Sequence, residues 1–172
     1  SNASSPLTEV HALEACRLVE QHLQGALDHP REEAHRQGMA MASLQAAMAF
    51  SNASLGVGHA LAHSLGGWLD LAHGALNARL LTSVIRCNAT AASDQYRKAA
   101  RAMGVETATG VEGVSALMGR VEHWERQMEP AIQSLVLDPD DEEQVIRAAL
   151  DDPCLLTNPV DVGEEDLRQL LR

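Results

Sequence analysis

The sequence predicts an all-α protein, a bundle of about seven or eight helices. Three observations lead to this fold class. Apolar residues recur at three- and four-residue steps over long segments, which is the helical period. Pro, Gly and capping residues divide the chain into segments of helix length. No run of alternating apolar and polar residues is long enough for a strand, and no internal repeat or low-complexity linker is present.

The first two helices are expected in the N-terminal third of the chain. Pro6 and a capping Thr8 begin an amphipathic helix over about 8–27, with apolar positions at Leu13, Cys16, Leu18, Val19 and Leu23. The Asp28-His29-Pro30 segment ends it. Residues 31–50 are rich in Ala and Met and carry charges only in their first turn, which predicts a helix that becomes progressively buried.

The later helices are shorter. Gly56 and Gly58 precede a short helix expected over 59–65, and Gly66-Gly67 is expected to stop it. Further helices are expected over about 74–88, 93–103, 111–127, 140–150 and 164–171. The acidic patch before the seventh helix lacks the central Gly and terminal Glu of a calcium loop, so it predicts a helix N-terminus favoured by the macrodipole; it comprises Asp138, Asp140, Asp141, Glu142 and Glu143.

Composition restricts the possible partners. The net charge of −11 disfavours binding to nucleic acid or to an anionic membrane, and no apolar run has the length of a membrane span. Three scattered cysteines without CxxC spacing favour a reducing, cytoplasmic location. Residues 1–3 resemble the remnant of an expression tag, so one helical domain is expected over 4–172.

Three histidines stand in one of the most apolar segments, residues 56–74. His59 and His63 are four apart, so on a helix their rings project from one face and could hold one metal ion. Ala60 occupies the position where a metalloprotease needs its general-base Glu, which argues against that class. His73 follows the glycine break and could join the other two rings. From spacing alone, His63 or His73 could instead cap a helix or satisfy a buried carbonyl.

The segment from Ala49 to Leu81 resembles the signature of the iron-containing, group III alcohol dehydrogenases, whose relatives include glycerol dehydrogenase and dehydroquinate synthase. The matching positions are Gly56, His59, His63, Gly66, Gly67, His73, Gly74, Asn77 and Ala78. Residues 6–19 and 152–171 also resemble the family's C-terminal helical domain. Two departures are Ala72, where Pro commonly precedes the last His, and Met128-Glu129-Pro130, where Leu-Gly-Ile-Pro is usual.

The resemblance implies a different metal pair from the one that spacing favours. It implies that His59 and His73 bind the divalent metal, usually Fe²⁺ and sometimes Zn²⁺, and that His63 is a catalytic proton relay beside it. Phe50 and Cys154 fall where the family has substrate-pocket residues, although packing in the core explains both equally well from sequence. The expected activity is oxidation of an alcohol, or reduction of an aldehyde, with NAD(P).

The resemblance also implies that part of the family's machinery lies outside these residues. The family's other two ligands, in a D-x-x-x-H motif, and its dinucleotide-binding domain would precede Pro6. This chain alone is therefore expected to hold neither metal nor NAD(P) and to be inactive. A homodimer that buries an apolar cleft around Phe50, His59, His63 and His73 is a further expectation. The alternatives are a metal-binding module, such as a sensor, and an inactive helical module for oligomerisation.

Overall fold

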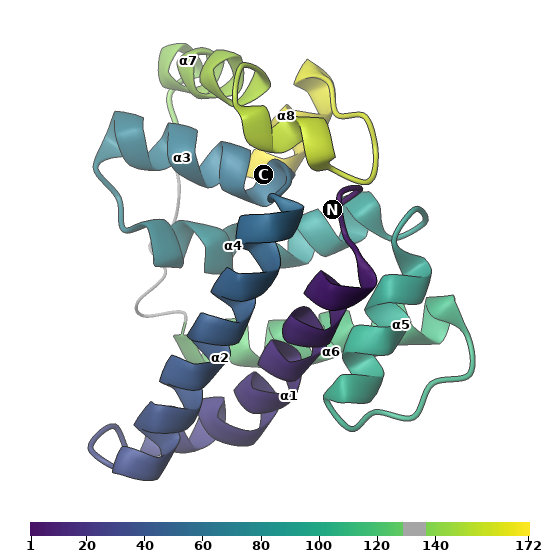
Figure 1. Cartoon of the computed structure of the whole chain (residues 1–172). Helices are drawn as coiled ribbons and strands as arrows, with labels where there is room; N and C mark the ends of the chain where they lie inside the picture. The colour runs from purple at the N-terminus through teal and green to yellow at the C-terminus, as the bar shows by residue number, and fades with distance from the viewer. Residues whose placement is uncertain (129–136) are drawn as a thin grey trace. The chain divides into compact units, whose positions relative to one another are not determined.

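A computed structural model describes residues 1–128 and 137–172, and Glu129 and Pro130 of the departure noted above lie outside these ranges. Every regular element in the described ranges is helical, so the all-α prediction is confirmed (Figure 1). The helices are α1 (Pro6–Asp28), α2 (Glu33–Ala53), α3 (Val57–Leu69), α4 (His73–Asn88), α5 (Ser93–Ala102), α6 (Gly110–Met128), α7 (Pro139–Leu150), the 3₁₀ helix η2 (Pro153–Thr157) and α8 (Glu164–Leu171). Within these ranges, no helix is both long and apolar enough to cross a membrane.

The chain divides into two compact units. The first unit consists of Ser1–Asn2, Leu55–Ala92 and Met118–Arg172, and the second of Ala3–Ser54 and Ser93–Leu117. Each unit is described by itself below. The expectation that residues 4–172 act as one domain stays a prediction.

In the second unit, α1 and α2 form an antiparallel helical hairpin (Figure 1). The N-terminus of α1 corrects the sequence prediction, because Ser5 rather than Thr8 is the N-cap. Ser5 Oγ accepts a hydrogen bond from the backbone N–H of Thr8, and Thr8 Oγ1 accepts one from the backbone N–H of Ser5 at 2.8 Å. Thr8 is thus the third residue of a reciprocal capping box, with Pro6 at the first helical position.

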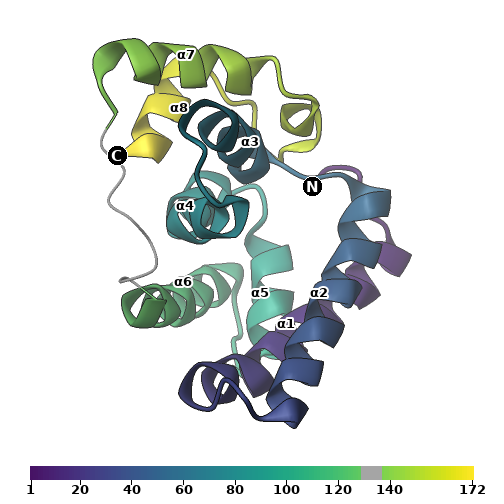
Figure 2. The same ribbon diagram turned by 90° about the vertical axis from the view of Figure 1, so that its left-hand side faces the viewer.

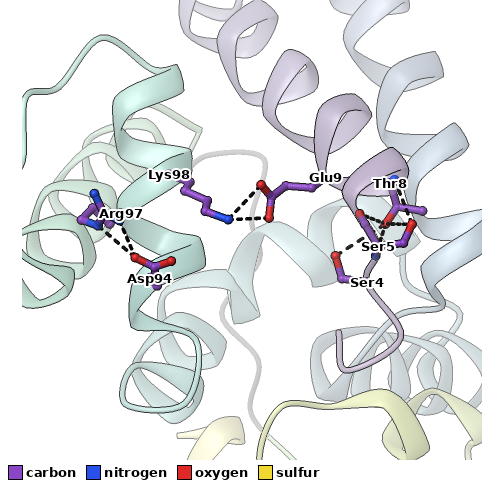
Figure 3. A network of polar contacts seen from close by, with 7 residues as sticks. All are labelled: Ser4, Ser5, Thr8, Glu9, Asp94, Arg97 and Lys98. Atoms are coloured by element: carbon purple, nitrogen blue, oxygen red, sulfur yellow. Dashed lines mark hydrogen bonds and ion pairs between the residues drawn. The ribbon is translucent and has the colours of Figure 1, made fainter.

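A polar network joins α5 to α1 in this unit (Figure 3). Lys98 Nζ on α5 donates to both carboxylate oxygens of Glu9 on α1, at 2.9 and 2.8 Å. Within α5, Arg97 pairs with Asp94 one turn before it. Because the Lys98 and Glu9 side chains are both partly exposed, this ion pair orients α5 on α1 more than it stabilises the unit.

In the first unit, α3 is the central helix and packs against α4 and α7 (Figure 2). It also packs against η2. Its buried side chains are Val57, Ala60, Leu61, Ala62, Ser64 and Leu65. They meet Leu76 and Leu80 of α4, Val145 and Ile146 of α7, and Leu167 of α8 in one apolar cluster. Burial of several large aliphatic side chains at about 1.5–3 kcal/mol each makes this cluster the main source of the unit's stability.

Two sequence predictions about these helices have different outcomes. The acidic patch is confirmed as a helix N-terminus, since Asp138 caps α7 and accepts hydrogen bonds from the N–H groups of Asp140 and Asp141. Gly66-Gly67 does not stop a short helix, because α3 runs from Val57 through both glycines to Leu69. The chain reverses instead at Asp70, which has a left-handed backbone with φ 53°.

A buried amide holds the loop after η2 to the start of α3. Asn158 Oδ1 accepts a hydrogen bond from the Val57 backbone N–H at 3.1 Å. Its Nδ2 donates to Asn88 Oδ1 at 3.0 Å and to the Val160 carbonyl at 2.9 Å. Asn158 and Asn88 are 4% and 3% exposed, so water cannot replace these hydrogen bonds.

We expect Asn158→Ala to destabilise the chain by about 3 kcal/mol, because it leaves the Val57 N–H and the Asn88 amide buried without partners. Urea unfolding followed by circular dichroism measures the change in the free energy of unfolding. Asn52→Ala is the matched control, since this exposed amide donates only to the Met48 carbonyl of its own helix. An equal effect of the two substitutions would contradict the structural role of Asn158.

Candidate functional site

The helical period of α3 places His59 and His63 on its side away from the apolar cluster. The three residues between them, Ala60, Leu61 and Ala62, are fully buried, whereas His63 is exposed and His59 is half-buried. Gly58 lets α4 approach α3 closely, because a Cβ there would lie 3.2 Å from Val84 Cγ2. The apolar residues of α3 therefore determine which side of the helix carries the two imidazoles.

His73 reaches the other two histidines because the chain turns back after α3. Asp70 reverses the direction, and His73 is the first residue of α4, after the N-cap Ala72. Asn77 lies one turn further along α4 and donates from Nδ2 to the His73 carbonyl at 3.0 Å. The same amide nitrogen lies 3.0 Å from His73 Nε2, so Asn77 orients the imidazole. The structure thus brings His59, His63 and His73 together.

The three imidazoles differ in how well they could share one metal ion. Two rings bound tetrahedrally at about 2.0–2.1 Å have centroids about 5.2 Å apart. The centroids of His59 and His73 are 5.3 Å apart with an interplanar angle of 54°. His63 and His73 are also 5.3 Å apart but are stacked at 15°, so their in-plane lone pairs do not converge. His59 and His63 are 6.0 Å apart. The His59–His73 pair fits a shared ion best.

His59 is suited to metal binding by its charge state as well. Partial burial, followed by the positive charges that His73 and His63 could carry, lowers the pKa of His59. The ring is therefore neutral at neutral pH, and the neutral imidazole is the form that binds a metal.

Asp152 is a member of this site that sequence reasoning missed. His63 Nδ1 lies 2.9 Å from Asp152 Oδ2, while Asp152 Oδ1 accepts the Cys154 backbone N–H at 2.8 Å and so caps η2. Burial acts to raise the pKa of Asp152, but the hydrogen bonds from the Cys154 backbone and from His63 outweigh it and lower the pKa. At neutral pH, Asp152 is therefore a carboxylate that accepts the Nδ1–H of His63.

Cys154 lies beside this pair in the first unit. One ligand-type atom each from His63, Asp152 and Cys154 lie within 4.8 Å of one another. Burial, and then the neighbouring Asp152 carboxylate, raise the pKa of the Cys154 thiol to about 11. The thiol is therefore neutral at physiological pH, which does not suit a nucleophile.

The pKa of Cys154 has a measurable consequence. We expect its alkylation by iodoacetamide to rise with pH around a midpoint near 11 in the folded chain, and around the ordinary thiol value after unfolding in urea. Mass spectrometry of Cys154 peptides over a pH series measures both midpoints. Equal midpoints in the two states would contradict the combined influence of burial and of Asp152 on this thiol.

Phe50, the other residue predicted for the substrate pocket, belongs to the second unit. It lies near the C-terminal end of α2 and is 42% exposed. Its assignment to the substrate pocket stays a prediction, as do the roles assigned to Cys154 and the three histidines.

Comparison with known proteins identifies close relatives of the whole chain. The profile described as "Fe-containing alcohol dehydrogenase family, C-terminal" matches residues 1–172. Alcohol dehydrogenase 4 of Schizosaccharomyces pombe is 32% identical over 176 residues, covering 100% of this chain and 41% of the relative. The 1-propanol dehydrogenase PduQ of Salmonella typhimurium is 36% identical over 181 residues, covering 99% of this chain and 49% of the relative.

Solved structures give the same result for the fold. A 1,3-propanediol oxidoreductase superposes with a TM-score of 0.91 at 29% identity, covering 99% of this chain and 46% of that one. An alcohol dehydrogenase from Oenococcus oeni superposes with a TM-score of 0.88 at 27% identity, covering 98% and 45%. The chain thus spans somewhat less than half the length of these relatives.

Proposed function

Since this chain belongs to the Fe-containing alcohol dehydrogenase family, of which it matches the C-terminal part, we propose that it is the metal- and substrate-binding portion of an NAD(P)-dependent alcohol dehydrogenase. The proposed substrates are small alcohols and their aldehydes. The observation that carries this proposal is the close approach of the His59 and His73 rings, whose centroids are 5.3 Å apart, with the His63–Asp152 pair beside them. A sensor or an oligomerisation module does not require an imidazole that is held by a carboxylate next to two metal-binding histidines.

His59 and His73 would supply two neutral nitrogen ligands to the metal. When bound, Fe²⁺ supplies a Lewis acid that lowers the pKa of the substrate hydroxyl, and NAD(P)⁺ supplies the hydride acceptor. Burial keeps His59 neutral. The remaining ligands are proposed to come from parts of the full-length protein outside these residues.

His63 is proposed to move the proton that leaves the substrate hydroxyl. Asp152 accepts the Nδ1–H of His63, which leaves Nε2 as the nitrogen that takes up the proton. The side chain of His63 is 44% exposed, so the proton can pass on to solvent. Cys154 is proposed to border the substrate as a neutral, weakly polar side chain.

An activity assay of the full-length protein tests this function. The protein loaded with Fe²⁺ is expected to reduce NAD⁺ or NADP⁺ with short primary alcohols, to lose this activity on chelation and to regain it when Fe²⁺ is restored. No oxidation across a panel of alcohols and no reduction of the matching aldehydes, in a protein that retains its metal, would contradict the proposal and favour a sensor or oligomerisation module.

The isolated chain of 172 residues is expected to retain no stoichiometric iron and to bind no NAD⁺. Two neutral imidazoles supply only about half of a four-ligand set and no negative charge to balance the ion, so most of the affinity is lost. Elemental analysis after desalting and a fluorescence titration with NAD⁺ measure the two quantities. Stoichiometric iron that survives desalting would mean that other residues of this chain complete the site.

A further inference from the structure

Two further histidines face each other across the α1–α2 hairpin of the second unit. His22 lies on the last third of α1 and His35 on the first turn of α2, thirteen residues later. Their rings are edge to face, with centroids 5.6 Å apart and an interplanar angle of 64°. Their Nδ1 atoms are 3.4 Å apart. No role in the proposed dehydrogenase chemistry is assigned to either residue.

Each ring occupies a space that a glycine on the opposite helix leaves open. A Cβ at Gly25 of α1 would lie 2.3 Å from His35 Nε2, and a Cβ at Gly38 of α2 would lie 2.2 Å from His22 Cγ. The arrangement is reciprocal, so any larger residue at either glycine would displace the ring facing it. Gly25 and Gly38 therefore leave room for the two imidazoles in the helix interface, where their Nδ1 atoms lie 3.4 Å apart.

The separation of the two nitrogens fits a shared metal ion better than a direct hydrogen bond. Nitrogen-to-acceptor hydrogen bonds are usually about 2.7–3.2 Å long, so 3.4 Å is long for one. Two nitrogens at about 2.0–2.1 Å from one tetrahedral ion are about 3.3–3.4 Å apart. Both rings are half-buried, so an ion can enter and keep open positions for water.

A carboxylate stands at the opposite side of one ring. Glu32 Oε1 lies 3.8 Å from His35 Nε2, and the Glu32 side chain is 52% exposed and can approach further. A histidine that binds a metal through one nitrogen commonly donates its other N–H to a carboxylate, which fixes the tautomer. Glu32 is in position to do this when Nδ1 of His35 binds an ion.

We propose that His22 and His35 form a second metal site, which binds a divalent transition-metal ion such as Zn²⁺ through their two Nδ1 atoms. With two protein ligands and water completing the shell, the site is an exchangeable one. It is separate from the His59–His73 pair in sequence and belongs to the other compact unit. The proposal is therefore independent of the proposed function.

The test is a titration of the isolated chain with Zn²⁺ at neutral pH, followed by NMR of the histidine rings, with signals assigned by single substitutions. The signals of His22 and His35 are expected to shift together along one binding curve. His35→Gln is expected to abolish the response of His22 as well as its own. His123→Gln, which removes an exposed histidine of α6, is the matched control and should leave that curve unchanged.

A second variant separates ligand loss from loss of fold. Gly38→Ala keeps every histidine but displaces the His22 ring, so it is expected to remove the shared binding curve while circular dichroism shows retained helix. The proposal is overturned if Zn²⁺ leaves both rings unshifted, or if His22 and His35 respond on separate curves. It is also overturned if His22 responds equally in His35→Gln.

Discussion

Replacing His59 or His73 by Ala in the full-length protein is expected to abolish both metal retention and alcohol oxidation. Each substitution removes one of the two proposed nitrogen ligands, which belong to rings whose centroids are 5.3 Å apart. The affinity of the site for the metal falls with each lost ligand. The helical fold should persist, since His73 is exposed and His59 only half-buried. Iron content per chain and the rate of NAD(P)H formation are the two measurements, with circular dichroism as the check on folding.

His63→Ala distinguishes the two assignments that the sequence left open. If His63 is the proton relay, the variant retains the metal and loses turnover by about 10²–10⁴-fold. If His59 and His63 form the metal pair instead, His63→Ala empties the site and His73→Ala does not. The ring centroids of His59 and His63 are 6.0 Å apart, against 5.3 Å for His59 and His73, which makes the first outcome the expected one.

Asp152→Asn is expected to lower kcat by about 10²-fold or more while the protein keeps its metal. The carboxylate holds the proton of His63 on Nδ1 through the 2.9 Å contact, and an amide that donates at that position would favour the opposite tautomer. Asn retains a side-chain oxygen that can still accept the Cys154 N–H, so the cap of η2 should survive.

Asp151→Asn is the matched control, because it removes the same charge from the exposed neighbouring residue. A readout that does not depend on activity comes from the ¹⁵N shifts of His63 in the isolated chain, which report its tautomer. A pure packing role for Asp152 would leave the tautomer unchanged, and equal loss of kcat in both variants would show a general charge effect.

The sequence determined the helical fold class and most helix positions, because amphipathic periodicity and capping residues act over only a few neighbouring positions. The acidic patch at Asp138 is an example, since its capping hydrogen bonds span two and three residues. The prediction from the sequence was wrong where tertiary packing outweighs the local helix preference of the residues. Two glycines cost a helix about 1 kcal/mol each relative to Ala, and burial of Leu61, Leu65 and their neighbours against α4 and α7 outweighs this, so α3 continues through Gly66-Gly67.

The same distinction applies to the candidate site. The sequence alone determined that His59 and His63 lie on one helical face and that His73 begins the next helix. Only the tertiary structure decided that Asp152, 89 residues after His63, holds its ring, and that His22 faces His35 across a hairpin. Periodicity assigns a residue to a face of its own helix. Which partner meets that face depends on helix crossing angles and on where glycines admit a side chain, and these follow from the packing of the whole unit.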